Sequence, residues 1–256
     1  MDDKSTGVGQ AEAQDDAASP PRWRWPRFAW VDNFRAVPDP AVAKRRYAKL
    51  AAHYEGSTGR IRTVRERTIE HLDLRPGQTV FDVACGAGAT LLALSDAVGP
   101  GGRVIGIEQS SDMAALARKA ADGRANVEVI CDSVATFRAP LQADAVLCCY
   151  THDVLQDPAA LDHLFAQVRP GARVAVAGLC LAPWWLTPAN AWVLWGARMY
   201  LTTWRGLRCP WSTLSKRCPE LRVRSRHHGL TGYIAVGCFD GKGTLESAIG
   251  SAQNDD

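Results

Sequence analysis

The sequence predicts an α/β fold with a doubly wound, mostly parallel sheet of seven strands and an antiparallel strand at its C-terminal end. Three observations predict it. Short apolar runs alternate with helical patterns between residues 79 and 179, as in parallel sheets covered by helices on both faces. Glycines and prolines punctuate these runs. The last two apolar runs are separated only by a short segment with glycine at both ends, which favours an antiparallel hairpin.

The first part of the chain predicts a tail, an arm and two helices. Residues 1–21 are polar and acidic and end in two prolines, which predicts a disordered tail. Residues 22–30 interleave arginine with tryptophan, a pattern typical either of a membrane or nucleic-acid contact or of an arm anchored on the domain. From Pro40 to Leu74 the apolar spacing is helical, and Gly56 and Gly59 divide it into two helices.

The central part predicts alternating strands and helices, and the last part predicts two strands and a second tail. Each predicted strand is a short apolar run that ends at a turn signal. The strands are expected at Thr79–Val83, Arg103–Ile107, Val127–Cys131, Ala143–Cys149, Ala172–Leu179, Leu221–His227 and Tyr233–Gly237. Helices are expected at Ala89–Ala97, Asp112–Ala121 and Ala159–Val168, and a disordered tail at residues 241–256.

Composition describes an ordinary globular protein and excludes several classes. Of 256 residues, 46% are hydrophobic and 22% charged, and the net charge of +3 is too small to predict a nucleic-acid partner. The eight cysteines show no zinc-binding spacing, so we expect no metal and reduced thiols. Four of them lie in predicted apolar runs: Cys131, Cys148, Cys149 and Cys180. The polar residues 1–10 predict no secretory leader and a cytoplasmic location.

One uncharged stretch, Val174–Ala197, is long enough to cross a bilayer. Pro183 and Pro188 interrupt it, and Asn190 breaks its apolar character. We therefore expect a buried strand, a loop and a helix here rather than a membrane span.

Candidate binding residues follow three successive strands. After the first strand, Asp82 precedes a turn that contains Gly86 and Gly88, and glycine lets a backbone approach a ligand closely. Glu108 ends the second strand and is placed to accept hydrogen bonds from ribose hydroxyls, while Asp132 follows the third strand. The alternative is that Glu108 and Asp132 cap the helices that follow them.

As a set, these residues resemble the class I S-adenosylmethionine-dependent methyltransferases, whose fold is Rossmann-like. Asp82 to Gly88 is similar to the first motif of that family, with Ala84 in place of its first glycine, and Glu108 and Asp132 match the ribose-binding and adenine-contacting acids. The resemblance covers about residues 45–240. It implies a methyltransferase domain at 76–240, preceded in the chain by an arm and helices at 22–75. It also implies S-adenosyl-L-methionine as the cofactor. The implied cofactor-binding residues are Asp82, Ala84, Gly86, Gly88, Glu108, Gln109, Asp132, Ser133 and Cys149.

A nicotinamide-binding domain is the nearest alternative. Its G-x-G-x-x-G fingerprint requires a third glycine where this chain has Leu91. The family pattern itself has one mild departure, Ala172 after the Pro170-Gly171 turn, where a second glycine is common.

Residues after the fourth strand are the predicted catalytic group. The resemblance places Cys149 to Asp153 between donor and acceptor, so His152 is the candidate general base and Asp153 its candidate orienting group. The alternative is that both residues stabilise the next turn. Tyr150 is expected to contact the acceptor.

The segment 182–219 is predicted to be an acceptor-side insert, and it holds six of the nine tryptophans. Trp185, Trp192, Trp195 and Met199 share one helical face, which is typical of a packing face and less often of a pocket wall. Trp184, Trp185 and Trp192 are the predicted acceptor-binding residues. Three arginines nearby are expected either to hold an acidic group or to form a solvated face: Arg198, Arg205 and Arg208.

The sequence therefore predicts an O- or N-methyltransferase acting on a small aromatic or lipophilic acceptor. Two other functions stay open at this point. One is a methyltransferase-like binding protein without catalysis. The other is a peripheral membrane methyltransferase that acts on a lipid or a quinone.

Overall fold

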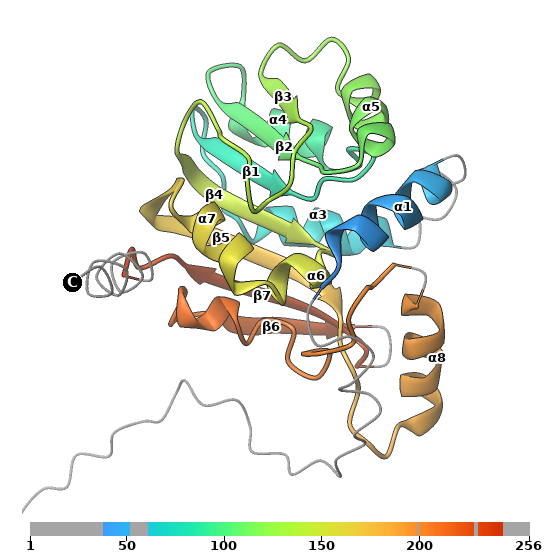
Figure 1. Cartoon of the computed structure of the whole chain (residues 1–256). Helices are drawn as coiled ribbons and strands as arrows, with labels where there is room; N and C mark the ends of the chain where they lie inside the picture. The colour runs from blue at the N-terminus through green and yellow to red at the C-terminus, as the bar shows by residue number, and fades with distance from the viewer. Residues whose placement is uncertain (1–37, 52–60, 199, 228–229, 243–256) are drawn as a thin grey trace, which may run out of the picture.

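The computed structural model describes residues 38–51, 61–198, 200–227 and 230–242. The predicted N-terminal tail, the Arg-Trp arm, the two glycines at 56 and 59, Met199, and the predicted C-terminal tail beyond residue 242 lie outside these residues. Within them, seven strands form one sheet in the order β3-β2-β1-β4-β5-β7-β6 (Figure 1). The strands are β1 Thr79–Val83, β2 Arg103–Ile107, β3 Val127–Ile130, β4 Ala143–Cys149, β5 Val168–Leu179, β6 Arg222–His227 and β7 Gly232–Cys238.

The strand directions confirm the predicted fold class. β1 to β5 pair in parallel, and β7 runs antiparallel to both β5 and β6. The chain order reverses next to β1, so the carboxyl ends of β1 and β4 flank the switch point where parallel α/β sheets bind ligands. The predicted C-terminal hairpin is the β6–β7 pair.

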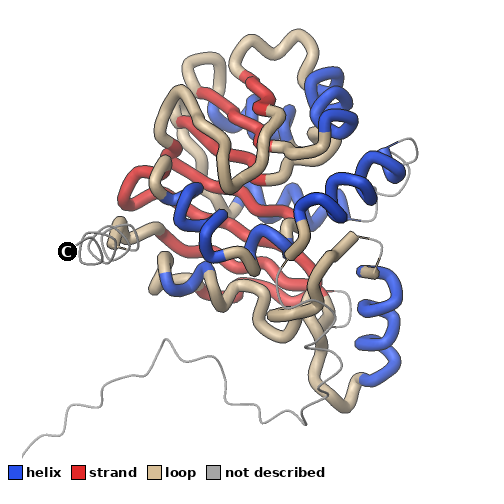
Figure 2. The backbone as a smooth tube through the Cα atoms, viewed as in Figure 1, coloured by secondary structure: helices blue, strands red, loops and turns tan. Residues whose placement is uncertain are grey.

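Helices cover both faces of the sheet (Figure 2). They are α1 Pro40–Ala51, α3 Arg62–Glu70, α4 Leu91–Val98, α5 Ser111–Ala120, α6 His152–Leu155, α7 Pro158–Phe165 and α8 Thr187–Ala197, with a short 3-10 helix, η2, at Leu214–Lys216. Strand β1 is buried along its whole length because its side chains alternate between two cores. Phe81 packs with α7 on one face, and Val80 packs with α3 and α4 on the other.

Most predicted boundaries agree with the structure to within two residues, and the two larger differences lie at the junction of α7 and β5. The helix expected to run to Val168 ends at Phe165, and β5 begins at Val168 rather than Ala172. Val168 pairs with Ala143 before a register shift, and the Gly171 N–H donates to the Phe239 carbonyl. The Pro170-Gly171 pair is thus a kink within the strand, whereas the sequence predicts a turn before it.

The insert forms a separate small layer beside the sheet. Helix α8 follows β5 after a loop, as expected, and no helix in the described part of the chain is long and apolar enough to cross a membrane. Its packing residues form a third apolar cluster with the loop beyond it: Leu181, Val193, Leu194, Ala197, Leu201 and Leu207.

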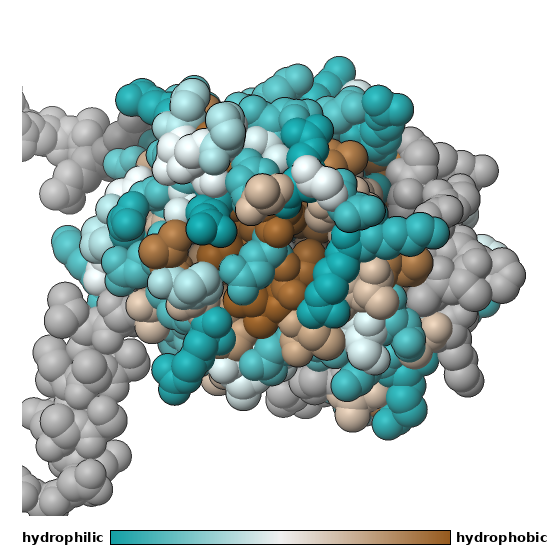
Figure 3. Space-filling model, turned by 90° about the horizontal axis from the view of Figure 1, so that it is seen from above, coloured by the Kyte–Doolittle hydropathy of each residue, from teal (hydrophilic) through white to brown (hydrophobic). Residues whose placement is uncertain are grey.

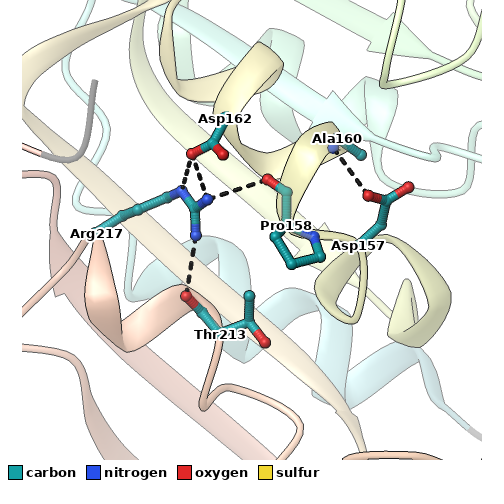
Figure 4. A network of polar contacts seen from close by, with 6 residues as sticks. All are labelled: Asp157, Pro158, Ala160, Asp162, Thr213 and Arg217. Carbon is teal, nitrogen blue, oxygen red and sulfur yellow. Dashed lines mark hydrogen bonds and ion pairs between the residues drawn. The ribbon is translucent and has the colours of Figure 1, made fainter. Parts of the chain in front are cut away.

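Arg217 fastens the end of the insert to α7 (Figure 4). Its guanidinium is buried, pairs with Asp162, and donates to the carbonyls of Pro158 and Thr213 at 3.0 and 3.2 Å. Pro158 is the first residue of α7 and Thr213 directly precedes η2, so one guanidinium connects the starts of both segments. The position of the insert is therefore fixed at its C-terminal side by one buried cation.

The face seen from above, on the β3 side of the molecule, carries an apolar area surrounded by hydrophilic side chains (Figure 3). The edge strand β3 is only partly buried, and Cys131 just beyond it is exposed, although the sequence placed it in an apolar run. An edge strand has a neighbour on one side alone, so its end is less covered than the ends of β1 and β4.

Candidate functional site

A cavity of about 400 Å³ lies at the carboxyl ends of β1, β2, β4 and β5. This volume is within the range of small-molecule sites. Its lining falls into three groups. One end is formed by Ala84, Gly86, Glu108 and Gln109. The floor is formed by the residues from Cys149 to Val154 together with Ala177, Gly178, Leu179 and Tyr233. The remaining walls are formed by Ala43, Tyr47, Ile61, Trp192, Val193, Gly196, Ala197, Tyr200, Leu201 and Leu207.

The glycine turn after β1 has a left-handed backbone at three positions. Ala84, Gly86 and Gly88 have φ of +51°, +59° and +83°. Glycine adopts such angles without strain. At Gly88 the reason is packing, because a Cβ there would lie 2.9 Å from the Ala117 Cα of α5. Gly88 does not line the cavity but lets the turn sit against α5, while Gly86 does line it.

Glu108 is the buried acid of the cavity, with 6% of its surface exposed. One carboxylate oxygen accepts the Gly86 N–H at 3.0 Å, and the other accepts the Ser110 N–H at 2.8 Å. Burial raises the pKa of Glu108, and the backbone donors oppose that rise. The carboxylate therefore joins the glycine turn to the start of α5, and each oxygen retains a lone pair for a ligand hydroxyl.

Asp82 and Asp132 are placed differently from Glu108, and neither lines the cavity. Asp82 is buried and accepts a hydrogen bond from the Thr90 hydroxyl, and burial raises its pKa to about 7. Asp132 accepts from the Ser133 N–H and the Thr136 hydroxyl in its own turn. The described residues between β3 and β4 include no helix, so Asp132 stabilises its own turn and does not cap a helix, the alternative that the sequence left open. Ser133, in the same turn, is also outside the lining.

Three consecutive residues after β4 have buried polar atoms without a hydrogen-bond partner. They are the Tyr150 hydroxyl, the Thr151 hydroxyl and Nδ1 of His152, and all three residues line the cavity. A buried polar atom without a partner costs roughly 1–3 kcal/mol. Tyr150 also has φ of +60°, a left-handed backbone that is rare for a bulky residue. Strain and unmet hydrogen bonds at one place are typical of a functional site.

His152 is held by the backbone of the insert. Its Nε2 lies 2.9 Å from the Arg205 carbonyl, which accepts hydrogen bonds only, so Nε2 carries the proton and Nδ1 has the free lone pair. Burial lowers the pKa of His152 to about 4, so the ring is neutral near pH 7.

Asp153 contacts the insert rather than the imidazole. Its carboxylate accepts the backbone N–H of Thr202 at 2.9 Å and the Thr202 hydroxyl at 2.6 Å. The Thr202 hydroxyl in turn accepts the Asp39 N–H at the start of α1. The group that orients His152 is thus the Arg205 carbonyl, and Asp153 instead connects α6, the insert and α1.

Cys149 lines the cavity, as expected for a residue at the end of β4. Burial raises its pKa, so the sulfur is a neutral thiol that contributes apolar surface. Within the described residues all eight cysteines are free.

The tryptophans of the insert do not form the packing face that was the more typical interpretation, and only one of the three predicted acceptor-binding tryptophans reaches the cavity. Trp192 lines the cavity, but Trp184 and Trp185 do not, and all three are more than half exposed. Helix α8 packs instead through Val193, Leu194 and Ala197 on its other side. An amphipathic pattern cannot identify the buried side of a helix whose residues are apolar all round.

Sequence analysis missed several cavity residues. Ala43 and Tyr47 of α1 form a wall, and Arg46 fixes that helix by donating to the carbonyls of Arg198 and Leu201. Tyr233 of β7 is buried behind Gly178. No local signal marks these residues, because each reaches the cavity through contacts with distant segments. Thr151 had one available signal, its position between two predicted site residues.

Comparison with known proteins gives the family of the central segment. Residues 80–171 match the family described as "Methyltransferase domain". This range runs from β1 into β5 and contains the glycine turn, Glu108 and His152.

Curated relatives match parts of the chain. A 37.1 kDa protein of transposon Tn4556 from Streptomyces fradiae is 37% identical over 47% of this chain and 35% of its own length. Demethylmenaquinone methyltransferase from Shouchella clausii is 41% identical over 26% and 29%. Nocamycin O-methyltransferase from Saccharothrix syringae is 31% identical over 52% and 49%. The chain thus spans half or less of each of these relatives.

Solved structures share the fold at low sequence identity. A SAM-dependent methyltransferase from Aquifex aeolicus has a TM-score of 0.52 and 23% identity, covering 77% of this chain and 98% of that one. The N-methyltransferase NodS from Bradyrhizobium japonicum, in complex with S-adenosyl-L-homocysteine, has a TM-score of 0.55 and 12% identity over 77% and 98%. The seven-stranded sheet of this chain is that of the class I methyltransferases.

Proposed function

Because residues 80–171 form a methyltransferase domain on the class I fold, we propose that this protein transfers a methyl group from S-adenosyl-L-methionine to a small lipophilic acceptor. One observation carries the proposal. A single cavity joins Gly86 and Glu108 at one end to Tyr150, Thr151 and His152 at its floor, three residues with a buried polar atom that has no partner. Methyl transfer requires the donor and the acceptor to be in contact, so the part of a site that binds the donor must adjoin the part that binds the acceptor.

The residues at the first end fit the donor. Glu108 is a buried carboxylate whose two oxygens each retain acceptor capacity, which suits a pair of ribose hydroxyls. Gly86, without a Cβ, lets the donor lie against the backbone of the turn. Gln109 completes this end, Cys149 adjoins it from the floor, and NodS, a protein of the same fold, binds the demethylated form of this donor.

The donor, when bound, supplies a methyl group already activated by a sulfonium, so the protein mainly has to position the acceptor and exclude water. Tyr150 and Thr151 have hydroxyls free to hold a polar group of the acceptor. Nδ1 of His152 is free to accept the proton of an acceptor hydroxyl. A base with a pKa of about 4 is weak, but it suffices late in the reaction, when methylation makes that proton strongly acidic.

The lining favours a flat or lipophilic acceptor. Apart from the polar atoms at its floor, the acceptor side consists of aromatic and aliphatic groups such as Tyr47, Trp192, Val193 and Tyr233. Such walls bury apolar ligands and leave a few polar groups to orient them. Two relatives have names that fit this class, a nocamycin O-methyltransferase and a demethylmenaquinone methyltransferase.

The test is methyl transfer by the full chain. Purified protein is incubated with methyl-deuterated S-adenosyl-L-methionine and a panel of phenols, hydroquinones and amines, and products are detected by mass spectrometry. We expect a labelled product from a lipophilic hydroxyl acceptor, and a much smaller yield from His152→Gln. Donor binding by calorimetry without transfer to any acceptor would favour the non-catalytic alternative. Absence of donor binding would remove the proposal.

A further inference from the structure

Helix α8 and the loop before it present an exposed aromatic surface. Trp184, Trp185, Trp192 and Trp195, called here the tryptophan face, expose 56%, 60%, 62% and 66% of their surface. Tryptophan is usually well covered in a folded chain, and a group of four exposed together marks an interaction surface.

The tryptophan face is a fixed surface at the margin of the molecule. The Asn190 side chain accepts the Ala182 N–H at 2.8 Å and donates to the Ala182 carbonyl at 3.1 Å, which ties the loop carrying Trp184 and Trp185 to the first turn of α8. Helix α8 stands at the right-hand edge of Figure 1, outside the layers that cover the sheet. Its inner side is used for packing, so only the outer side is available for a partner.

The segment of chain that carries this face is basic, and the Asp153 carboxylate that contacts it is already bonded to the Thr202 N–H and hydroxyl. Residues 174–208, which include α8 and the loops on either side of it, contain no aspartate or glutamate and three arginines: Arg198, Arg205 and Arg208. The Arg198 guanidinium lies over the Trp195 ring at 4.3 Å. Helix α1, which is bonded to the same segment through Arg46, also lacks acidic residues and exposes Lys44 and Arg45. The chain as a whole is nearly balanced in charge, so this segregation is specific to the region.

We propose that the tryptophan face docks on an anionic lipid bilayer. Tryptophan rings are favoured at the level of lipid headgroups, where one side of the ring meets acyl chains and the N–H meets water. Basic residues next to such rings are attracted by anionic lipids, and no carboxylate of residues 174–208 opposes that attraction. Helix α8 has eleven residues, too few to cross a bilayer, so its contact with a membrane would be at the surface.

The docking surface continues into the cavity. Trp192 belongs to the tryptophan face and also lines the cavity, and Gly196 one turn later lines it as well. A lipophilic acceptor dissolved in the bilayer would therefore enter beside α8 without crossing water. This link to an acceptor rests on the proposed function, whereas the docking itself rests on the surface alone.

The test is vesicle flotation of the full chain without donor or acceptor, so its outcome is independent of methyl transfer. Vesicles of phosphatidylcholine alone are compared with vesicles that also contain phosphatidylglycerol. We expect binding to the anionic vesicles, a blue shift of tryptophan fluorescence, and weaker binding as salt is raised. The double variant Trp185→Ser, Trp195→Ser should weaken vesicle binding by about tenfold or more. Lys44→Glu with Arg45→Glu should weaken it roughly fivefold for each basic residue replaced.

Leu92→Ser with Leu141→Ser is the matched control, because it removes two exposed apolar side chains, 42% and 45% exposed, from elsewhere in the molecule. It should bind as the unchanged protein does, and circular dichroism checks that every variant is folded. Three results would overturn the proposal: no binding to anionic vesicles at low salt, equal loss in the control, or a dimer in solution that the tryptophan variant dissociates while vesicles remain unbound. The last result would assign the face to a second copy of the chain.

Discussion

Glu108 is the side chain whose hydrogen bonds should contribute most to donor binding. Its oxygens are already oriented by the Gly86 and Ser110 amides, so a ribose would meet a preorganised acceptor. Glu108→Ala should cost about 1.5–3 kcal/mol of donor affinity, the contribution of hydrogen bonds to a charged group. Calorimetry with S-adenosyl-L-methionine measures it. Glu128→Ala, an exposed carboxylate on the neighbouring β3, should leave the dissociation constant unchanged. An effect of only a few tenths of a kcal/mol at Glu108 would contradict the ribose-binding role.

Gly86 is needed for a second reason, close approach of the donor to the backbone. Gly86→Val should abolish donor binding by placing a branched side chain in the cavity. It should also cost about 1–2 kcal/mol of stability, because a side chain is strained at this left-handed φ. Gly123→Val is the matched control, since Gly123 has φ of +77° but open space around it. Both variants should lose similar stability in urea unfolding, and only Gly86→Val should lose donor binding in calorimetry.

His152 should make stability depend on pH in a definite direction. Its pKa is lowered to about 4 in the folded chain, against 6.5 for an ordinary histidine. At a pH between these two pKa values, the histidine is protonated in the unfolded chain and neutral in the folded chain. The stabilising effect is therefore complete above about pH 6.5 and is lost as pH falls toward 4, by up to about 3 kcal/mol.

Urea unfolding of the unchanged protein and of His152→Gln, from pH 7.5 to 4.5, measures this effect. The glutamine does not titrate, so the difference between the two curves isolates the histidine. The comparison is needed because Asp82, whose pKa is raised to about 7, gains protons on folding in this range and stabilises the chain as pH falls. Parallel curves for the two proteins would show that His152 is not buried as described.

At the scale of elements, Arg217 decides how firmly the insert is attached. Arg217→Met keeps the apolar stem but leaves two carbonyls and Asp162 without their buried donor. We expect a loss of about 1–3 kcal/mol, seen as a lower melting temperature at roughly 2–4 °C per kcal/mol. Arg124→Met breaks the exposed pair with Asp96 and should change stability by less than about 1 kcal/mol. Equal effects of the two variants would refute the fastening role.

The elements that could be predicted are those whose limits are set locally. Strands β1, β2 and β4 begin and end as predicted because each is a buried apolar run followed by a turn. The start of β5 could not be predicted, because Val168 becomes a strand residue only by pairing with Ala143. Helix α6 was not predicted either, since its four residues are too few to show a helical period.

At the scale of the whole molecule, the donor should stabilise the native fold. A ligand that binds only the folded chain, present at one hundred times its dissociation constant, adds about 2.7 kcal/mol. A thermal shift of several degrees is therefore expected with S-adenosyl-L-methionine or S-adenosyl-L-homocysteine. NAD is the comparison ligand, since the glycine turn lacks the third glycine that dinucleotide sites need. Stabilisation by NAD and not by the adenosyl ligands would reverse the assignment.

The site could be predicted only in part from the sequence. Glu108, Gly86, Tyr150 and His152 follow strand ends, and the fold brings strand ends to one edge. Whether an acid at a strand end turns toward the cavity or toward its own turn depends on neighbours, and Asp132 illustrates the second outcome. Tyr47 lies about one hundred residues from the floor of the cavity in sequence, so only the packing of α1 reveals it.

Cavity residues 84–109 lie in one short stretch of sequence, whereas the opposite walls are drawn from α1 and from residues 177–207. The two sets of walls can therefore diverge independently in evolution. Duplicated genes can retain the ancestral donor chemistry while drift and selection reshape α8 and the loop beyond it. A chimera that carries α8 and the following loop of one relative on the remaining chain of another would then take the acceptor of the first protein and keep the donor site of the second.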